Sequence, residues 1–276
     1  MKRKIFPIFI ISLMLMLTIP TNAYSSATDI EQSTGVMSEE EIEKKRALFD
    51  SLEQSMGEIE SLEHLPQSSI MSTGIQIGTN KTVYPTAGQV YTSDIPARTD
   101  AAQGGNWLDC RSEYAPFNSG NGYAWGWIGE YLTVSGSGSR SCDIIINGRY
   151  EGVLQAVEIG IIPLIYTSAF GSLYLQVYDV TGGGFTLVKQ QKIFERGIEI
   201  TAMPHDFYGT LGSSQKMTCT LQGGRNYLVR ATLRTEAECG TGATGVSVWG
   251  LSDFASNPKG ANGQGVDISS IRINWN

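Results

Sequence analysis

Apolar and polar residues alternate with a period of two from about residue 74 onward, and this pattern constrains the fold more than any other feature. The clearest segment is Leu173–Tyr178, where successive side chains would fall on opposite faces of a strand. Residues 227–234 alternate in the same way and give one apolar and one mostly polar face. No helical pattern separates these segments, so a parallel α/β sheet is not expected. We therefore predict an all-β fold over residues 74–276, an antiparallel β-sandwich that is jelly-roll-like.

Glycine-rich turn signals divide this region into strands. Asn147-Gly148 stands between two strand-like runs and favours a two-residue hairpin, because both residues tolerate positive φ. Glycines also mark turns at 181–184 and 222–225. Residues 99–122 read as a long loop, and loops of that length are usually functional. The other strand-like segments are 123–134, 140–147, 149–159, 184–195, 216–222, 244–250 and 266–275.

The N-terminus resembles a cleavable secretory signal. Basic residues at positions 2–4 precede an apolar run from Ile5 to Ile19, and Thr21-Asn22-Ala23 follows as a small-residue cleavage site. An uncleaved anchor is the alternative, although the run is shorter than the roughly 20 residues that span a bilayer. We predict that residues 1–23 are removed. The mature protein is then secreted or held at the cell surface, with no membrane span.

Residues 24–73 read as an acidic linker that contains an amphipathic helix at about 38–65. Ser38 is a suitable N-cap, and the three glutamates after it complement the positive end of a helix. The apolar stripe has a seven-residue repeat and consists of Ile42, Phe49, Leu52, Met56 and Ile59, with Lys45 in one core position. Such a helix either packs on the body or self-associates as a short coiled coil.

The chain has a net charge of −7, and the charge is unevenly distributed. Residues 29–64 hold 11 acidic and 3 basic residues, whereas 65–276 hold 16 acidic and 14 basic residues. Nucleic-acid binding is not expected from a chain without a basic excess. The nearly neutral body should recognise a partner through shape, aromatic rings and hydrogen bonds.

Four cysteines in an exported chain predict disulfides. They allow three pairings, of which we favour Cys110–Cys142 and Cys219–Cys239; buried reduced thiols are the alternative. The spacings fit neither a zinc ribbon nor a CxxC redox pair, and no motif for a metal or another cofactor is present.

Paired carboxylates are the remaining route to catalysis, because no nucleophile elbow is present. Glu130 and Glu158 lie on different predicted strands, while Glu195 and Glu199 share one face if a single strand continues through Gly197. Two acids about 5–9 Å apart would suit glycoside hydrolysis. Gly197 indicates a turn, however, and exposed acids are ordinary on sandwich strands. No catalytic residue is therefore assigned.

Aromatic residues give the best candidate for a binding site. Trp125 and Trp127 project to one face of a predicted strand, together with Tyr123 and Tyr131. Indoles spaced in this way form either a platform that stacks on sugar rings or a buried core stripe. In the predicted loop, Trp107 and Tyr114 would line a binding rim.

Three functions follow from these patterns. The first is an exported, non-catalytic β-sandwich that binds a polysaccharide or another cell-surface ligand. The alternative is a structural protein of the cell surface or matrix that self-associates through residues 38–65. The second alternative is a secreted glycoside hydrolase.

Overall fold

A computed structural model describes residues 35–62, 72–93, 98–103, 106–114, 120–159, 167–199, 204–239, 247–254 and 265–276. All of them belong to one compact unit, Gly35–Asn276. The predicted signal peptide at 1–23 lies outside the described residues. Within them, none of the helices is both long and apolar enough to cross a bilayer.

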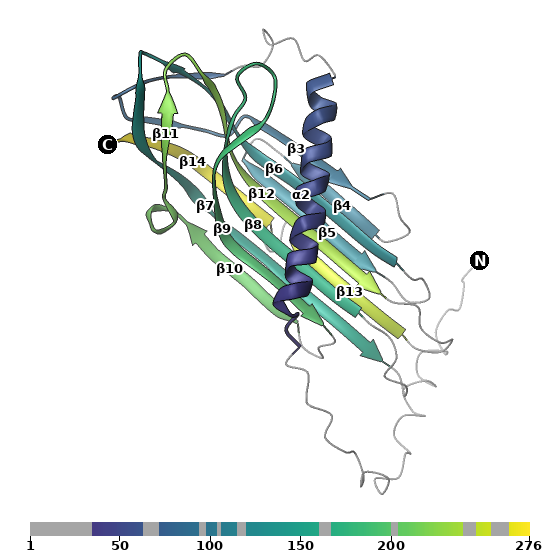
Figure 1. The fold of residues 1–276 in the computed structure, drawn as a ribbon. Helices are drawn as coiled ribbons and strands as arrows, with labels where there is room; N and C mark the ends of the chain where they lie inside the picture. Colours follow the sequence, from purple (N-terminus) through teal and green to yellow (C-terminus); the bar gives the residue numbers. More distant parts are fainter. Residues whose placement is uncertain are drawn as a thin grey trace, which may run out of the picture. The chain divides into compact units, whose positions relative to one another are not determined.

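Six strands form the first sheet, sheet A (Figure 1). Its order is β1-β6-β12-β8-β9, and β3 pairs with β6 next to β1. All pairs are antiparallel except β1 with β6, which is parallel. The strands are β1 (Thr73–Gln76), β3 (Ala87–Thr92), β6 (Gly120–Ser135), β8 (Thr167–Asp179), β9 (Thr186–Glu199) and β12 (Asn226–Cys239).

Eight strands form sheet B, in the order β10-β7-β13-β5-β14-β2. β11 also pairs with β7, β4 with β5, and β14 with β7. The strands are β2 (Lys81–Val83), β4 (Arg98–Gln103), β5 (Trp107–Tyr114), β7 (Ser139–Ile159), β10 (His205–Leu211), β11 (Met217–Gln222), β13 (Ser247–Phe254) and β14 (Gly265–Trp275). The 3-10 helix η1 (Ser213–Gln215) connects β10 to β11.

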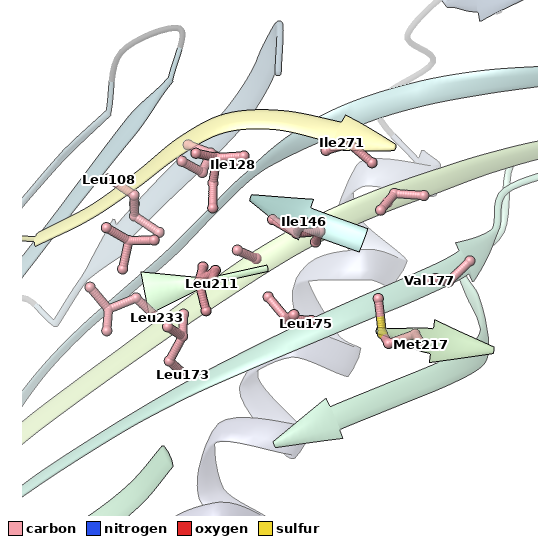
Figure 2. Close-up of a cluster of buried hydrophobic side chains, with 14 of the residues drawn as sticks. Leu108, Ile128, Ile146, Leu173, Leu175, Val177, Leu211, Met217, Leu233 and Ile271 are labelled. Atoms are coloured by element: carbon pink, nitrogen blue, oxygen red, sulfur yellow. The ribbon is translucent and has the colours of Figure 1, made fainter. Parts of the chain in front are cut away.

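The core lies between the two sheets, which confirms the predicted β-sandwich. Ile128, Leu173 and Leu233 of sheet A meet Leu108 and Ile146 of sheet B, and all are fully buried or nearly so (Figure 2). From β5 to β8 the chain changes sheet at each strand, and it changes again between β11, β12 and β13. This alternation is the jelly-roll-like feature of the fold.

A third layer covers the opposite face of sheet A. Helix α2 (Glu39–Leu62) begins at its predicted cap, where the Glu41 amide donates to Ser38 Oγ at 3.3 Å. The helix lies along sheet A (Figure 1). Its Ile42 and Phe49 side chains are buried against aromatic side chains of that sheet. Full burial of a side chain such as Phe49 contributes roughly 1.5–3 kcal/mol. The helix thus packs on the body, as the first of the two interpretations of its stripe predicted.

The predicted hairpin at Asn147-Gly148 is wrong, because β7 runs unbroken through both residues. Gly148 pairs with Ile268 of β14 next to a β-bulge. A Cβ on Gly148 would lie only 2.0 Å from the Asp267 carbonyl oxygen. This glycine therefore serves the close approach of two strands and not a turn. The turns expected at 181–184 and 222–225 are confirmed.

The predicted loop at 99–122 is also wrong, since most of it forms β4 and β5 and the beginning of β6. In β5, Leu108 and Cys110 point into the core, while Trp107, Asp109 and Arg111 occupy the alternate positions. The inward and outward residues of β5 do alternate with a period of two. The polar residues at the outward positions nevertheless made this stretch resemble a loop.

Substitution of Gly148 by alanine tests this strand assignment. The new methyl group would collide with the β14 backbone, so we expect G148A to lower the free energy of unfolding by about 1–3 kcal/mol. Chemical denaturation measures the change. G74A is the matched control, because a Cβ on this strand glycine meets nothing within 4 Å. Equal effects of the two substitutions would contradict the assignment.

Candidate binding face

The predicted aromatic platform is not exposed. Trp125 and Trp127 are each only 3% exposed and lie on the face of sheet A that α2 covers. The Tyr91 ring stacks on Trp125 with centroids 4.3 Å apart, and Tyr131 meets Trp127 edge-on. Tyr123 and Tyr131 are partly buried in the same cluster. The buried-stripe interpretation therefore holds for these four residues, although their cover is a helix and not the second sheet.

Charged residues cross the boundary between α2 and sheet A. Glu53 accepts hydrogen bonds from Arg230 and Arg234 at 2.7 Å, and Asp50 accepts one from Arg234 at 2.8 Å. Lys45 Nζ lies 2.8 Å from a carboxylate oxygen of Glu236. A buried ion pair adds little net stability to a protein. Removal of one partner is nevertheless strongly destabilising, because the other charge is left buried and unpaired. These ion pairs therefore fix the position of the helix on the sheet more than they strengthen its attachment.

Aromatic rings share these arginines with the acids of the helix. The Arg230 guanidinium lies 4.5 Å from the Tyr178 ring centroid and 5.6 Å from that of Trp127. Arg234 lies 5.0 Å from the Tyr174 ring centroid. Cation–π contacts of this kind strengthen when water is excluded. The stripe is thus part of a largely buried network of rings and charges that α2 completes.

Glu195 belongs to the same network. Arg46 binds its two oxygens at 3.0 and 2.5 Å, and Tyr174 and Lys192 donate to it as well. Burial opposes ionisation, but the hydrogen bonds from these groups outweigh it and lower the pKa of Glu195 to about 2. Burial likewise opposes the charge of Lys45, yet the nearby Glu236 and Glu238 raise its pKa to about 12.

The considered carboxylate pairs do not form a hydrolytic site among the described side chains. The turn expected at Gly197 is wrong, because β9 continues through it and Met37 packs where a side chain would lie. Glu195 and Glu199 do share a face, but four residues of strand separate them by about 13 Å. Glu130 is buried and accepts from the hydroxyls of Thr73 and Thr86. The Glu158 side chain lies outside the described ones.

Neither favoured disulfide is present in the structure, which describes all four cysteines. Cys219 lies on β11 in sheet B, whereas Cys239 ends β12 in sheet A, 14 residues beyond the turn that joins these strands. Cys110 is in register with Phe254 and Ala101, while Cys142 is in register with Trp275 and Cys219. The pairing predicted from sequence spacing is wrong because Cys110 and Cys142 lie in different rows of sheet B, while Cys219 and Cys239 lie in different sheets.

The outer face of sheet B holds exposed aromatic and charged side chains in cross-strand register. One row crosses four strands, from Trp107 of β5 to Asp267 of β14, Arg149 of β7 and Thr210 of β10. In the next row, Tyr208 of β10 pairs with Glu151 of β7. At a strand spacing of about 4.8 Å, the first row extends about 14 Å. We call Trp107, Arg149, Glu151, Tyr208 and Asp267 the outer-B face.

The outer-B face is open to solvent and polar between its rings. Tyr208 is 79% exposed and Trp107 is 36% exposed, whereas Trp125 and Trp127 are buried. Arg149 Nε donates to Asp267 Oδ2 at 2.8 Å, and both side chains remain exposed. The face therefore offers two ring surfaces on either side of an exposed guanidinium–carboxylate pair.

Of the predicted site residues whose side chains the structure describes, Trp107 alone lies on this open face. Tyr114 ends β5, and its side chain is outside the described ones. Sequence reasoning missed Arg149, Tyr208 and Asp267. The alternation of Asp206, Tyr208 and Thr210 with inward Phe207 and Leu211 could have revealed β10, but the preceding Met203-Pro204 made this stretch resemble a turn.

Comparisons with known proteins identify no family. No protein-family model and no curated protein matches the chain. TmCBM61, solved in complex with β-1,4-galactotriose, matches at 12% identity over 60% of this chain and 83% of its own, with a TM-score of 0.18. The CBM22-1 xylan-binding domain of Xyn10C from Paenibacillus barcinonensis matches at 12% identity over 73% of this chain and 97% of its own, with a TM-score of 0.17. TM-scores this low do not establish a common fold.

The pKa of Glu195 predicts how acid weakens the attachment of α2. This group keeps its charge in the folded protein down to about pH 2, whereas it takes up a proton near pH 4.5 when the chain unfolds. Its contribution is therefore complete above pH 4.5 and is lost as the pH falls towards 2. We expect E195Q to be less stable than the wild type at pH 6 and to lose less stability on acidification, by up to about 3 kcal/mol.

Urea denaturation at several pH values between 2 and 6 measures this difference. E43Q, on the exposed side of α2, is the control and should follow the wild type. Parallel pH curves for E195Q and the wild type would contradict the assigned role of Glu195.

Proposed function

We propose that this protein is an exported, non-catalytic binding module for a neutral polysaccharide, which it holds on the outer-B face. The observation that carries the proposal is the exposed pair of rings, Trp107 and Tyr208, on either side of the Arg149–Asp267 pair. Export is supported by the composition of residues 1–23.

The chemistry of the face suits sugar rings. A pyranose presents a face of C–H groups that can lie on an indole or phenol ring, and its rim of hydroxyls needs donors and acceptors. Arg149 supplies donors, and Asp267 and Glu151 supply acceptors, in the same rows as the rings. A flat row of about 14 Å accommodates several consecutive units of an extended chain.

The charge of the face selects against acidic glycans. In the two rows that contain the rings, Arg149 is accompanied by the exposed acidic residues Glu151 and Asp267 and by Asp109, which is buried. A polyanion would meet this acidic excess at close range, and the repulsion would lower its affinity. Neutral polymers bear no such cost, because carboxylates bind hydroxyl groups readily.

The other two predicted functions are less well supported. The described part of the α2 stripe is already packed on sheet A, so self-association through 38–65 has no open apolar surface in that part and stays a prediction. Two of the four glutamates considered for hydrolysis are already engaged: Glu195 by Arg46 of the helix, and Glu130 by the hydroxyls of Thr73 and Thr86.

Removal of the two rings tests the proposal. We expect the wild type to be retained by at least one insoluble neutral polysaccharide in a panel of cellulose, chitin, xylan and mannan. W107A and Y208A should each weaken binding about tenfold, which corresponds to about 1.4 kcal/mol of lost contact. Depletion isotherms measure the change, and thermal melting checks that the variants remain folded.

L187A provides a matched control, because it shortens an exposed apolar side chain on β9 of sheet A. It should bind as the wild type does. The proposal fails if W107A/Y208A is folded and retained like the wild type, if no neutral polymer is bound, or if polygalacturonate is preferred.

A further inference from the structure

Cys142 and Cys219 lie opposite one another on neighbouring strands. They are register partners in the antiparallel pair of β7 and β11, and both side chains belong to the core between the sheets. Directly opposite residues of an antiparallel pair have Cα atoms about 4.5–5.5 Å apart. This interval falls within the 4.4–6.8 Å that the Cα atoms of a disulfide span. Both thiols are free in the structure, and a bond between them requires rotation of the side chains and a small approach of the two Cβ atoms.

The two thiols differ in exposure and in the direction of their pKa shifts. A hydrogen bond from Cys142 lowers the pKa of Cys219, and Lys189 acts in the same direction; hydrogen bonding to Cys219 raises the pKa of Cys142. Cys219 is also at the boundary of the core, while Cys142 is fully buried. The thiolate is the attacking species, so Cys219 meets the oxidant first and Cys142 reacts second.

We propose that Cys142 and Cys219 form the disulfide of this protein once it meets a low-molecular-weight disulfide or a thiol–disulfide oxidoreductase. The Cys219 thiolate attacks one sulfur of the oxidant and releases the first thiol. The Cys142 sulfur then attacks the mixed disulfide, loses its proton to solvent and releases the second thiol. Two cysteine thiols are oxidised and one external disulfide is reduced to two thiols, so atoms and electrons balance.

The bond would secure an edge of sheet B. β11 pairs with β7 alone among the described strands, and Cys142 also faces Trp275 at the end of β14. A link at this row would hold β11 to β7, the strand that carries Arg149 and Glu151 of the outer-B face. It would also close a long segment of chain, and closing long segments restricts the unfolded ensemble most.

The other two cysteines have different surroundings. Cys239 Sγ lies 3.7 Å from Thr167 Oγ1, and Cys110 Sγ lies 3.9 Å from the Leu233 carbonyl oxygen. Neither has a second cysteine as its register partner. The structure thus assigns one bridge and not the two that sequence spacing predicted.

Peptide mapping of the full chain tests the assignment. The folded protein is treated with oxidised glutathione, unfolded in the presence of iodoacetamide and digested with trypsin without reduction. Trypsin places the four cysteines in separate peptides, with Cys142 in 141–149 and Cys219 in 217–225. We expect these two peptides to appear as one linked species, two hydrogens lighter than their sum, while Cys110 and Cys239 are alkylated.

Thermal stability gives an independent readout. The oxidised wild type should melt about 10 °C above the reduced protein, and this difference should vanish in C219A. C110A/C239A is the matched control and should still yield the linked peptides. Peptide mapping of the wild type alone can overturn the proposal. It would do so if Cys142 and Cys219 were alkylated after oxidation, or if either one were linked to Cys110 or Cys239.

Discussion

The attachment of α2 to sheet A determines how the rest of this protein can be used. Acidic side chains of the helix reach two buried arginines of β12, and basic side chains reach buried glutamates of β9 and β12. The basic residues Lys45 and Arg46 precede the acidic residues Asp50 and Glu53 along the helix, and each pair faces the opposite charge on the sheet. A helix that slid by one turn would therefore leave several of these charges buried and unpaired. That penalty is severe in a dry environment, and it selects one position of the helix.

This arrangement divides the two sheets by role. Sheet A is covered on both sides, by sheet B and by α2, and its tryptophans serve as interior packing. Sheet B has one face in the core and one in solvent, so its outward positions are available for recognition. The same strands thus hold the core with alternate residues and present Trp107, Tyr208, Arg149 and Asp267 with the others. The residues of the outer-B face belong to sheet B, whereas α2 packs on sheet A.

The architecture could be predicted from the sequence, because period-two alternation and glycine turns are local signals. The helix and its cap were predictable for the same reason. Long-range pairing was not: Asn147-Gly148 looks like a hairpin until the approach of β14 is known, and the cysteine partners depend on strand register. The sequence shows that Trp125 and Trp127 form an aromatic stripe, but it does not show whether the stripe is exposed or buried. The position of α2 decides that the two side chains are buried. Trp107 was recognised as a candidate, but its polar neighbours come from three distant strands.

The proposed function requires the ligand to bind on the outer-B face while the aromatic stripe of sheet A stays beneath α2. Amide-resolved NMR of the full chain, titrated with a neutral oligosaccharide cut from a polysaccharide that the protein retains, tests it most directly. We expect the shifts to gather at Trp107, Arg149, Tyr208 and Asp267, including the Trp107 indole N–H. Shifts centred on Trp125, Trp127 and Phe49 would contradict it, because they would show that the ligand displaces the helix.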